Sequence, residues 1–411
     1  MAGLAKWFAG LSAGALVLGA AALAQQPAAP PPTGLPRSLQ EAEAMEAADA
    51  LPRTAFYDTP ATLAATRPGA LLRQEAADGY ELPPGARAVR ILYHSRDAEG
   101  RDVATSAVVL VPAGTPPPGG WPIIAWAHGT SGVGRMCAPS LMKDLAYGEE
   151  GLLPMVRNGY AVVATDYHGL GTEGPHEYVS KTAQARDVID AIPAARAAAP
   201  TLGRRWVVDG HSQGGLAAWG VAEIERTAKA PDYLGAVAVA PATHLEVLAA
   251  MKTAPKGVAY YLDYLAFAIH ARWPAFRPDD MLTGAALARY HDVTSKGCWD
   301  YAYASYLDVG PGALKPGWSE RPAAKAFFAS NVVGEIPVGP MLVIAGEADQ
   351  TVALAGVKAA VASACRRGST LAFRTYPGLD HDPVMFKSTP DQLVWIGARF
   401  AGRPAAGGCG A

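Results

Sequence analysis

The chain has 411 residues, of which 50% are hydrophobic and 18% charged, so it can bury a large core and most of it is not expected to be disordered. Its 35 basic and 37 acidic residues give a formal net charge of -2, which argues against a nucleic-acid partner because such proteins usually carry clustered positive charge. The 44 glycines and 34 prolines predict long loops and argue against a coiled coil or a repeat array.

The N-terminal segment predicts export. Lys6 precedes an apolar stretch over residues 7–23, and the Ala-Leu-Ala at residues 22–24 places small residues at the spacing that signal peptidase accepts. We expect residues 1–24 to be a signal peptide cleaved after Ala24, and the mature protein to be secreted or periplasmic. An uncleaved anchor is the alternative, but the stretch is short, contains glycine and precedes proline-rich sequence. No other segment is long and apolar enough to span a bilayer, so we expect a soluble chain without a stable membrane anchor.

The cysteines fit an oxidising compartment. Cys137, Cys298, Cys365 and Cys409 all lie in the predicted mature chain, and an even number of cysteines there predicts two disulfides. Three connectivities are open, and the spacing does not choose among them. There is no Cys-x-x-Cys pair and no metal-ligand spacing with the nine histidines, so the sequence predicts no metal site.

The segment after the predicted signal peptide is interpreted as a linker over residues 25–51. It begins with a Pro/Ala-rich tract, residues 25–36, that we expect to be extended or disordered. Residues 39–50 are rich in glutamate and alanine and predict a short, exposed helix. Two β-rich runs then follow, at residues 86–94 and 103–111, and predict an antiparallel hairpin.

Short apolar runs alternate with helical patterns in the rest of the chain. The predicted strands are residues 121–127, 161–165, 206–208, 234–240, 341–345 and 371–376, with helices such as 183–199 and 214–228 between them. Near-continuous apolar strands that alternate with helices predict an α/β fold with a mostly parallel central sheet and helices on both faces.

The rhythm of strand and helix is interrupted between residues 240 and 341, where no convincing strand is found. This interval predicts a helical cap over residues 243–335, inserted between the two parts of an α/β core at residues 52–242 and 336–411. It contains an aromatic-rich stretch whose members are Tyr290, Trp299, Tyr301, Tyr303 and Tyr306. Any one of these is more often core packing than a ligand contact, although together they would suit an apolar substrate tunnel.

The strongest chemical motif is Gly210-His211-Ser212-Gln213-Gly214, between the run at 206–208 and a helical segment. A Gly-x-Ser-x-Gly at a strand-to-helix junction is typical of a nucleophile elbow, in which a strained turn exposes the serine hydroxyl. Gly210 and Gly214 remove side chains that would collide in this turn. Ser212 is therefore the predicted nucleophile, and a plain glycine-rich turn is the alternative.

A serine nucleophile needs a base and an orienting carboxylate, which in this type of fold follow in the order Ser, Asp, His. Asp349 comes just after the run at 341–345, and His381 comes just after the run at 371–376, so both should reach the same sheet edge as Ser212. Glu347 and Asp380 are the rival acids. Asp380 is the weaker one, because it is adjacent to the histidine in sequence.

Two backbone N–H groups should stabilise the oxyanion of the reaction. Gln213, directly after the nucleophile, supplies one. The other should come from the loop after residues 121–127, with Thr130 preferred over Ser131. His128 in the same loop is interpreted as structural rather than as a base. Asp166, at another strand end, is interpreted as a carboxylate that braces its loop.

These motifs resemble the secretory lipase family, of the lipase A type, within the α/β-hydrolase superfamily. The resemblance rests on Ala127-His128-Gly129-Thr130, Thr165-Asp166-Tyr167-x-Gly169-Leu170-Gly171, the elbow with Gly215, and the Asp349 and His381 loops, and it covers roughly residues 54–400. It implies hydrolysis of carboxylic esters and a helical lid over an acyl tunnel. It also implies disulfides between Cys137 and Cys298 and between Cys365 and Cys409, which would tie the oxyanion loop to the cap and the C-terminal tail to the final helical region.

The predicted function is a serine carboxylic ester hydrolase that works through an acyl-enzyme and needs no cofactor. Its expected partner is a small-molecule or lipid ester of apolar or aromatic character, and it could contact a lipid interface transiently. The sequence specifies no oligomeric state. A serine peptidase or amidase with the same triad, and a noncatalytic hydrolase-like binding module, are the alternatives.

Overall fold

The computed structural model describes residues 34–247, 259–308, 313–405 and 407–409, and residues 36–411 form one compact unit. The predicted signal peptide and nearly all of the Pro/Ala-rich tract lie outside the described residues. No helix within the described ranges is both long enough and apolar enough to cross a membrane.

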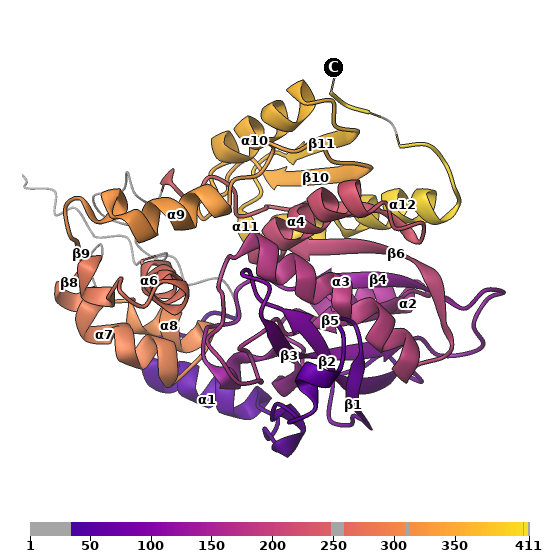
Figure 1. Ribbon diagram of the computed structural model, residues 1–411, viewed down its shortest axis with the longest axis horizontal. Coiled ribbons are helices and arrows are strands. Elements are labelled where there is room, and N and C mark those ends of the chain that lie inside the picture. Colours follow the sequence, from indigo (N-terminus) through magenta and orange to yellow (C-terminus); the bar gives the residue numbers. More distant parts are fainter. Residues whose placement is uncertain (1–33, 248–258, 309–312, 406, 410–411) are drawn as a thin grey trace, which may run out of the picture. The chain divides into compact units, whose positions relative to one another are not determined.

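A nine-stranded sheet forms the centre of the unit (Figure 1). Its strands, in the order in which they lie in the sheet, are β1 (Leu71–Ala76), β2 (Arg87–Arg96), β3 (Asp102–Val111), β5 (Ala161–Thr165), β4 (Trp121–Ala127), β6 (Leu202–His211), β7 (Tyr233–Val239), β10 (Met341–Gly346) and β11 (Leu371–Tyr376). From β5 to β11 all neighbours are parallel, whereas β1, β2, β3 and β5 pair antiparallel. The mostly parallel sheet and the opening hairpin are therefore confirmed, and β1 is an additional strand that the sequence did not predict.

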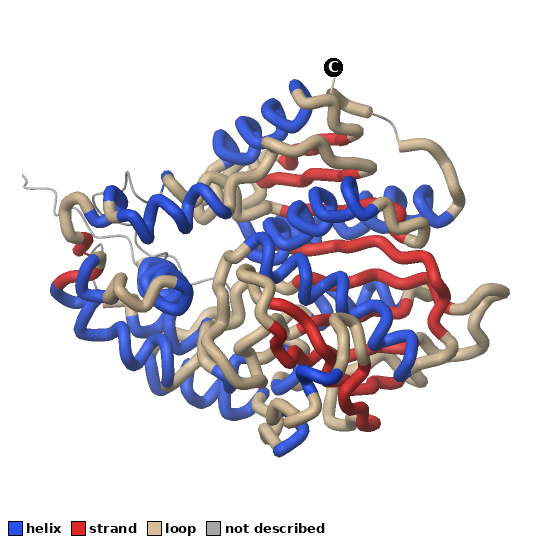
Figure 2. Tube along the Cα trace, in the orientation of Figure 1, coloured by secondary structure: helices blue, strands red, loops and turns tan. Residues whose placement is uncertain are grey.

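Helices cover both faces of this sheet, as Figure 2 shows. The apolar side chains of β4 alternate, with Ile123 and Ala125 in one buried cluster and Ile124 and Trp126 in the other. On the first face lie α3 (Lys181–Ala198), α4 (Gln213–Ala228) and α10 (Leu354–Arg366), and on the second lie α2 (Leu153–Arg157), α11 (His381–Lys387) and α12 (Thr389–Phe400). The predicted α/β fold with helices on both faces is thus confirmed.

The chain between β7 and β10 is mainly helical where it is described. It contains α6 (Tyr261–Arg272), α7 (Gly284–Ser295), α8 (Trp299–Ser305) and α9 (Pro322–Ser330), and β8 (Leu282–Thr283) pairs with β9 (Ala313–Leu314) in a two-stranded ribbon. Aromatic side chains of this segment pack around Tyr260, whose ring centroid lies 6.1 to 6.4 Å from the rings of Tyr264, Trp299, Tyr303 and Tyr306. These contacts are those of a packed aromatic core.

Several further helical elements within the described residues are short single turns. The 3-10 turns are Ala55–Tyr57, Leu63–Ala65, Arg135–Cys137, Pro139–Leu141, Pro278–Asp280 and Trp318–Glu320, and Gly148–Leu152 is a π-helix.

The N-terminal helix α1 (Leu39–Asp49) has a partner that its sequence does not reveal. Ser38 caps it by accepting the N–H of Glu41 at 3.1 Å. Glu46 points to the start of α8, where its carboxylate accepts the N–H of Cys298 at 2.9 Å and that of Tyr301 at 2.8 Å. The carboxylate thereby satisfies N–H groups that the first turn of α8 leaves free. The helix was predicted to be exposed, but one side of it is bound to the start of α8.

Two disulfides join segments that are far apart in the sequence. Cys137, after β4, is bonded to Cys298 at the start of α8, and Cys365 in α10 is bonded to Cys409. These are the two pairs that the resemblance implies. The N–H of Gly408 also donates to the carbonyl of Leu371 at 2.7 Å, so the end of the tail is held against α10 and β11, whereas its start is bonded to the last helix, where Arg399 donates to the carbonyl of Pro404 at 3.0 Å.

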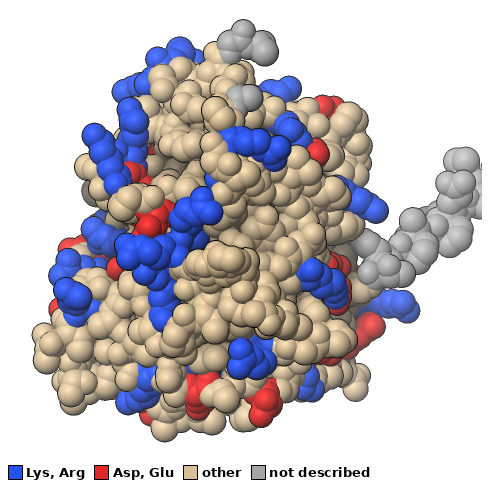
Figure 3. Space-filling model, turned by 90° about the vertical axis from the view of Figure 1, so that its right-hand side faces the viewer, with Lys and Arg blue, Asp and Glu red and all other residues tan. Residues whose placement is uncertain are grey.

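Charged side chains of both signs are interspersed on the face shown in Figure 3, with wide neutral areas between them. This distribution fits the small net charge of the chain.

Candidate active site

Ser212 lies in a strained turn between β6 and α4. Its backbone has φ 57° and ψ -116°, a left-handed conformation that non-glycine residues seldom adopt and that often marks a functional site. A Cβ atom on Gly214 would lie 1.8 Å from the carbonyl oxygen of Ala127, and one on Gly210 would lie 2.3 Å from that of Gly214. The two glycines of the motif are thus required by the close approach of the backbone at this turn.

The structure brings Ser212, His381 and Asp349 into one hydrogen-bonded chain. His381 is the first residue of α11, and its Nε2 accepts the hydroxyl of Ser212 at 2.8 Å. Its Nδ1–H donates to Oδ2 of Asp349, also at 2.8 Å. All three side chains are at most 8% exposed, so bulk water weakens these bonds little.

Asp349 is itself held by the loop that follows β10. Its other oxygen, Oδ1, accepts the N–H of Thr351 at 2.8 Å and that of Val352 at 2.7 Å. The two rival acids, Glu347 and Asp380, have other hydrogen-bond partners. Glu347 is exposed and accepts the hydroxyl of Thr375, whereas Asp380 caps α11 by accepting the N–H of His381. Of these three carboxylates, only Asp349 reaches the imidazole.

The hydrogen bond to Asp349 decides the protonation of His381. Burial disfavours the charged imidazolium, but the hydrogen bond and the negative charge of Asp349 outweigh it, so the pKa of His381 is raised above its usual 6.5. The carboxylates of Asp380 and Asp382 raise it further. The same hydrogen bond keeps the proton on Nδ1 and leaves the lone pair of Nε2 directed at Ser212.

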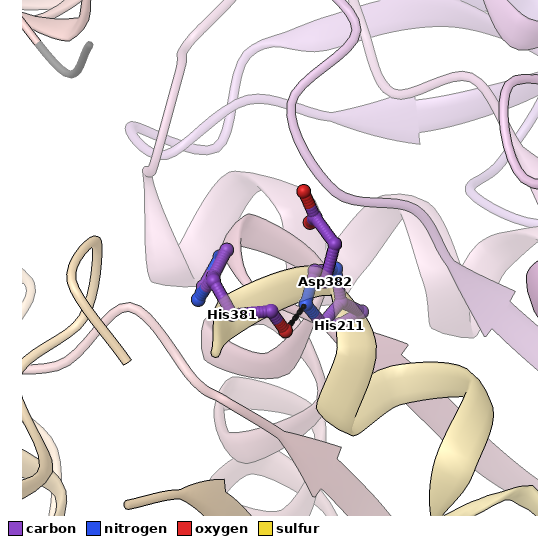
Figure 4. A group of neighbouring side chains, drawn as sticks. All are labelled: His211, His381 and Asp382. Atoms are coloured by element: carbon purple, nitrogen blue, oxygen red, sulfur yellow. Dashed lines mark hydrogen bonds between the residues drawn. The ribbon is translucent and has the colours of Figure 1, made fainter. Parts of the chain in front are cut away.

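His211, the residue before the serine, contacts His381 through its ring and through a hydrogen bond to the main chain. Its ring is fully buried, lies 4.7 Å from the ring of His381 and donates from Nε2 to the main-chain oxygen of His381 at 3.1 Å (Figure 4). Burial, and then the proximity of His381, lower the pKa of His211 well below 6.5. It therefore stays neutral and acts as a hydrogen-bond donor to the backbone.

His211, His381 and Asp382 are the only group within the described residues whose ligand atoms lie close enough together, within 4.8 Å, to suggest a metal site. Both ring nitrogens of His381 are already hydrogen-bonded to Ser212 and Asp349, and Nε2 of His211 is bonded to a carbonyl. A metal ion could use His381 as a ligand only by breaking this chain of bonds. The donor set therefore fits proton transfer better than metal coordination.

The two residues predicted to stabilise the oxyanion lie on different elements. Gln213 is the first residue of α4, where an N–H group has no acceptor within its helix. Thr130 is buried in the loop after β4, and its Oγ1 lies 2.9 Å from the hydroxyl of Tyr178. The alternative donor, Ser131, lies in the same loop and is bonded to both sides of the disulfide: its hydroxyl donates to the carbonyl of Cys137 at 2.7 Å, and its own carbonyl accepts the N–H of Trp299 at 3.0 Å.

Two other predicted residues have structural contacts. The ring nitrogens of His128 lie 2.6 and 3.1 Å from the carbonyl oxygens of Gly129 and Asp166, and neither is bonded to Ser212. The carboxylate of Asp166 is fully buried and accepts the hydroxyl of Ser106 and the N–H and hydroxyl of Ser140. It thus links β3 to the segment after Cys137.

Comparisons with known proteins identify the family of the chain. The family model described as secretory lipase matches residues 145–408. The chain belongs to the secretory lipase family. Lipase 10 of Candida albicans is 22% identical to this family member over 397 residues, which cover 87% of this chain and 83% of that protein.

Two solved structures share the fold. Lipase A of Candida antarctica in its closed state superposes with a TM-score of 0.72 at 17% identity, covering 87% of this chain and 90% of that one. The cell wall degrading esterase LipA of Xanthomonas oryzae superposes with a TM-score of 0.67 at 20% identity, covering 82% and 98%. As a secretory lipase family member with an α/β-hydrolase fold, the chain is an ester hydrolase.

The sequence did not predict the contacts of His176 and Tyr178 in the candidate active site, nor that His211 supports His381. His211 occupies a variable position of the elbow motif. His176 and Tyr178 lie in the loop after β5, of which only the first part, up to Gly171, was considered. The density of glycines in that loop, at 169, 171 and 174, is the signal that could have drawn attention to it.

Proposed function

We propose that this secretory lipase family member is a serine carboxylic ester hydrolase that uses Ser212, His381 and Asp349 and forms an acyl-enzyme. The observation that carries the proposal is the pair of 2.8 Å hydrogen bonds that link the serine hydroxyl, the imidazole and the carboxylate in that order. This order matches the roles of nucleophile, general base and orienting group.

The reaction proceeds in two acyl transfers. The hydroxyl oxygen of Ser212 attacks the ester carbonyl while Nε2 of His381 takes its proton, and the carbonyl electrons move to the oxygen. When the tetrahedral intermediate collapses, the bond to the leaving alkoxide breaks and His381 returns the proton to it, which releases the alcohol. Water then repeats the sequence on the acyl-serine and releases the acid. Asp349 keeps His381 in the required tautomer and stabilises the imidazolium.

The main-chain N–H groups of Gln213 and Thr130 are proposed to bind the developing oxyanion. Such donors act where water is excluded, and the loss of one typically costs about 10² to 10³ in rate. Both residues are at most 6% exposed, so the proposed site is shielded from bulk water in this way.

The substrate is proposed to be an apolar or aromatic ester bound beneath a helical cap at residues 243–335. Tyr261, on α6, supports this because its phenol lies close to the acids beside His381. Burial raises the pKa of Tyr261 to about 12, with the charges of Asp382 and Asp349 adding to this effect and the hydrogen bonds to Tyr260 and Trp299 opposing it. A buried phenol that remains neutral near these acids suits an aromatic or apolar acyl chain.

The protein is further proposed to be secreted or periplasmic. Both disulfides and the family membership support an oxidising compartment outside the cytosol.

Hydrolysis of p-nitrophenyl esters by Ser212→Ala tests the proposed function. We expect turnover to fall by about 10³ or more while the melting temperature changes little, because the lost hydroxyl makes one hydrogen bond at the site. Wild-type turnover by this variant would refute the assignment. A series of esters of increasing acyl length, run beside a p-nitroanilide, then defines the acyl preference and separates esterase from amidase activity.

A further inference from the structure

The loop that follows β5, residues 166–180, is packed tightly against itself. A Cβ atom on Gly169 would lie 2.4 Å from the main-chain nitrogen of His176, and one on Gly174 would lie 2.8 Å from the ring of His168. Tyr167 and Val179, towards the two ends of the loop, both have positive φ, at 64° and 46°. Such backbone is stable only where its surroundings over-determine it, so this loop has little freedom to move.

This loop contacts both residues that are proposed to carry the oxyanion donors. The hydroxyl of Tyr178 lies 2.9 Å from Oγ1 of Thr130, and Nε2–H of Gln213 donates to Nε2 of His176 at 3.1 Å. His176 and Tyr178 are only two residues apart in this loop, yet one contacts the start of α4 and the other contacts the loop after β4.

A third contact joins the same loops. The hydroxyl of Tyr167 donates to the main-chain oxygen of His128 at 3.1 Å, two residues before Thr130. The ring of His176 lies between those of Tyr167 and Tyr178, at centroid distances of 6.1 and 6.2 Å. The loop after β4 is thus held at two points by a rigid row of aromatic rings.

We propose that His176 and Tyr178 are positioning residues of the oxyanion site, which fix Gln213 and Thr130 relative to each other before substrate arrives. This inference rests on the proposed function. An oxyanion site accelerates the reaction only if its donors already lie 2.7 to 3.1 Å from the future oxyanion, because their reorganisation would cost part of the gain. Two donors on separate elements therefore benefit from a single rigid support.

The chemistry of His176 suits a permanent support. Its Nδ1–H donates to the main-chain oxygen of His168 at 2.9 Å, which fixes the proton on Nδ1 and leaves Nε2 as an acceptor for Gln213. Complete burial lowers the pKa of His176 to about 3, so the acceptor persists at every pH at which the enzyme would work.

Two substitutions test the proposal while leaving the packing largely intact. Tyr178→Phe removes one oxygen, and His176→Phe removes the acceptor but keeps an aromatic ring. His176→Gln restores an acceptor that can occupy the position of Nε2. Tyr160→Phe is the matched control, because Tyr160 lies directly before β5, at the other end of the same strand. Melting temperatures are measured for all four variants.

The readouts are kcat and KM for a p-nitrophenyl ester and the affinity for phenylboronic acid, which adds to a serine oxygen to give a tetrahedral adduct. We expect kcat to fall about 5- to 50-fold for both phenylalanine variants, less than the loss of a whole donor. Boronic acid affinity should fall in parallel, whereas KM and the pH at which activity is half-maximal should stay the same. His176→Gln should recover part of kcat.

The outcomes separate the two proposals. If Ser212→Ala is inactive but Tyr178→Phe and His176→Phe match the wild type, the positioning role is wrong and the proposed function stands. A rise in KM with unchanged boronic acid affinity would also overturn it, because that pattern indicates contact with substrate in its ground state. If Ser212→Ala keeps wild-type turnover, both proposals fail.

Discussion

Replacing Asp349 with asparagine should reverse the tautomer of His381. Oδ1 of Asp349 accepts two main-chain N–H groups, from Thr351 and Val352, and Oδ2 accepts Nδ1–H of His381. An asparagine can satisfy the two main-chain donors only by placing its carbonyl oxygen at the Oδ1 position. Its NH₂ group then faces His381 and donates to Nδ1, so the ring proton must move to Nε2. The lone pair that should accept the proton of Ser212 is then lost.

The expected loss of kcat is about 10⁴-fold, the size seen when the equivalent change is made in a serine protease with an otherwise intact site. This corresponds to about 5.4 kcal/mol of transition-state stabilisation at about 1.36 kcal/mol per tenfold change. Because asparagine has the same shape and keeps the main-chain bonds, the melting temperature should change by only a few degrees.

The assay is steady-state hydrolysis of a short p-nitrophenyl ester by Asp349→Asn, with Glu347→Gln as the matched control. Glu347 precedes Asp349 by two residues in the same loop, but its carboxylate is exposed and contacts Thr375. The control should keep activity within about twofold, as surface substitutions usually do. More than a tenth of wild-type kcat in Asp349→Asn, or an equal loss in the control, would refute the tautomer argument.

Three further predictions concern the pH profile, the elbow and the disulfides. Because only neutral His381 can accept a proton and its pKa is raised, kcat/KM should increase with pH through a midpoint above 6.5. Replacing Asp382 with asparagine should move this midpoint to lower pH, because the charge of Asp382 raises the pKa of His381. An unchanged midpoint in Asp382→Asn would contradict this charge effect. Gly214→Ala should abolish activity or folding because its Cβ would lie 1.8 Å from the Ala127 oxygen, whereas Gly407→Ala, with open space around it, should be neutral in the same ester assay and thermal melt. Chain entropy predicts that removing the disulfide that closes 161 residues costs about 5 kcal/mol and the one that closes 44 residues about 4 kcal/mol, and equilibrium denaturation with the order reversed would reject that account.

How well each strand could be predicted depended on how completely it is buried. The run at 121–127 matches β4, whose residues are apolar and almost all buried. Only residues 206–208 of β6 were predicted, because Arg204 and Arg205 at its start are exposed and interrupt the apolar pattern. The edge strand β1 was missed for the same reason, since its Leu-Leu-Arg-Gln-Glu-Ala sequence is only partly buried and carries charges that edge strands commonly have.

The residues of the candidate site differ in whether a local motif or the path of the folded chain determines their position. Ser212 could be inferred because its strained turn requires glycines at fixed positions nearby, and Asp349 and His381 because parallel strands end at one edge of the sheet. The contacts of His176 and Tyr178 follow from the path of a folded loop, which neither periodicity nor a short motif encodes. Side chains that act through other residues are therefore the part of the site for which coordinates are needed.

Burial explains why a single histidine should titrate at this site. His128, His176 and His211 are all buried, and desolvation lowers the pKa of His128 to about 4, that of His176 to about 3 and that of His211 well below its usual value. Each bonds to main-chain carbonyls or an amide, which do not stabilise a charged ring enough to offset burial. His381 is also buried, but it alone among these four has a carboxylate, Asp349, as its partner. The pairing with Asp349 therefore singles out His381 as the general base.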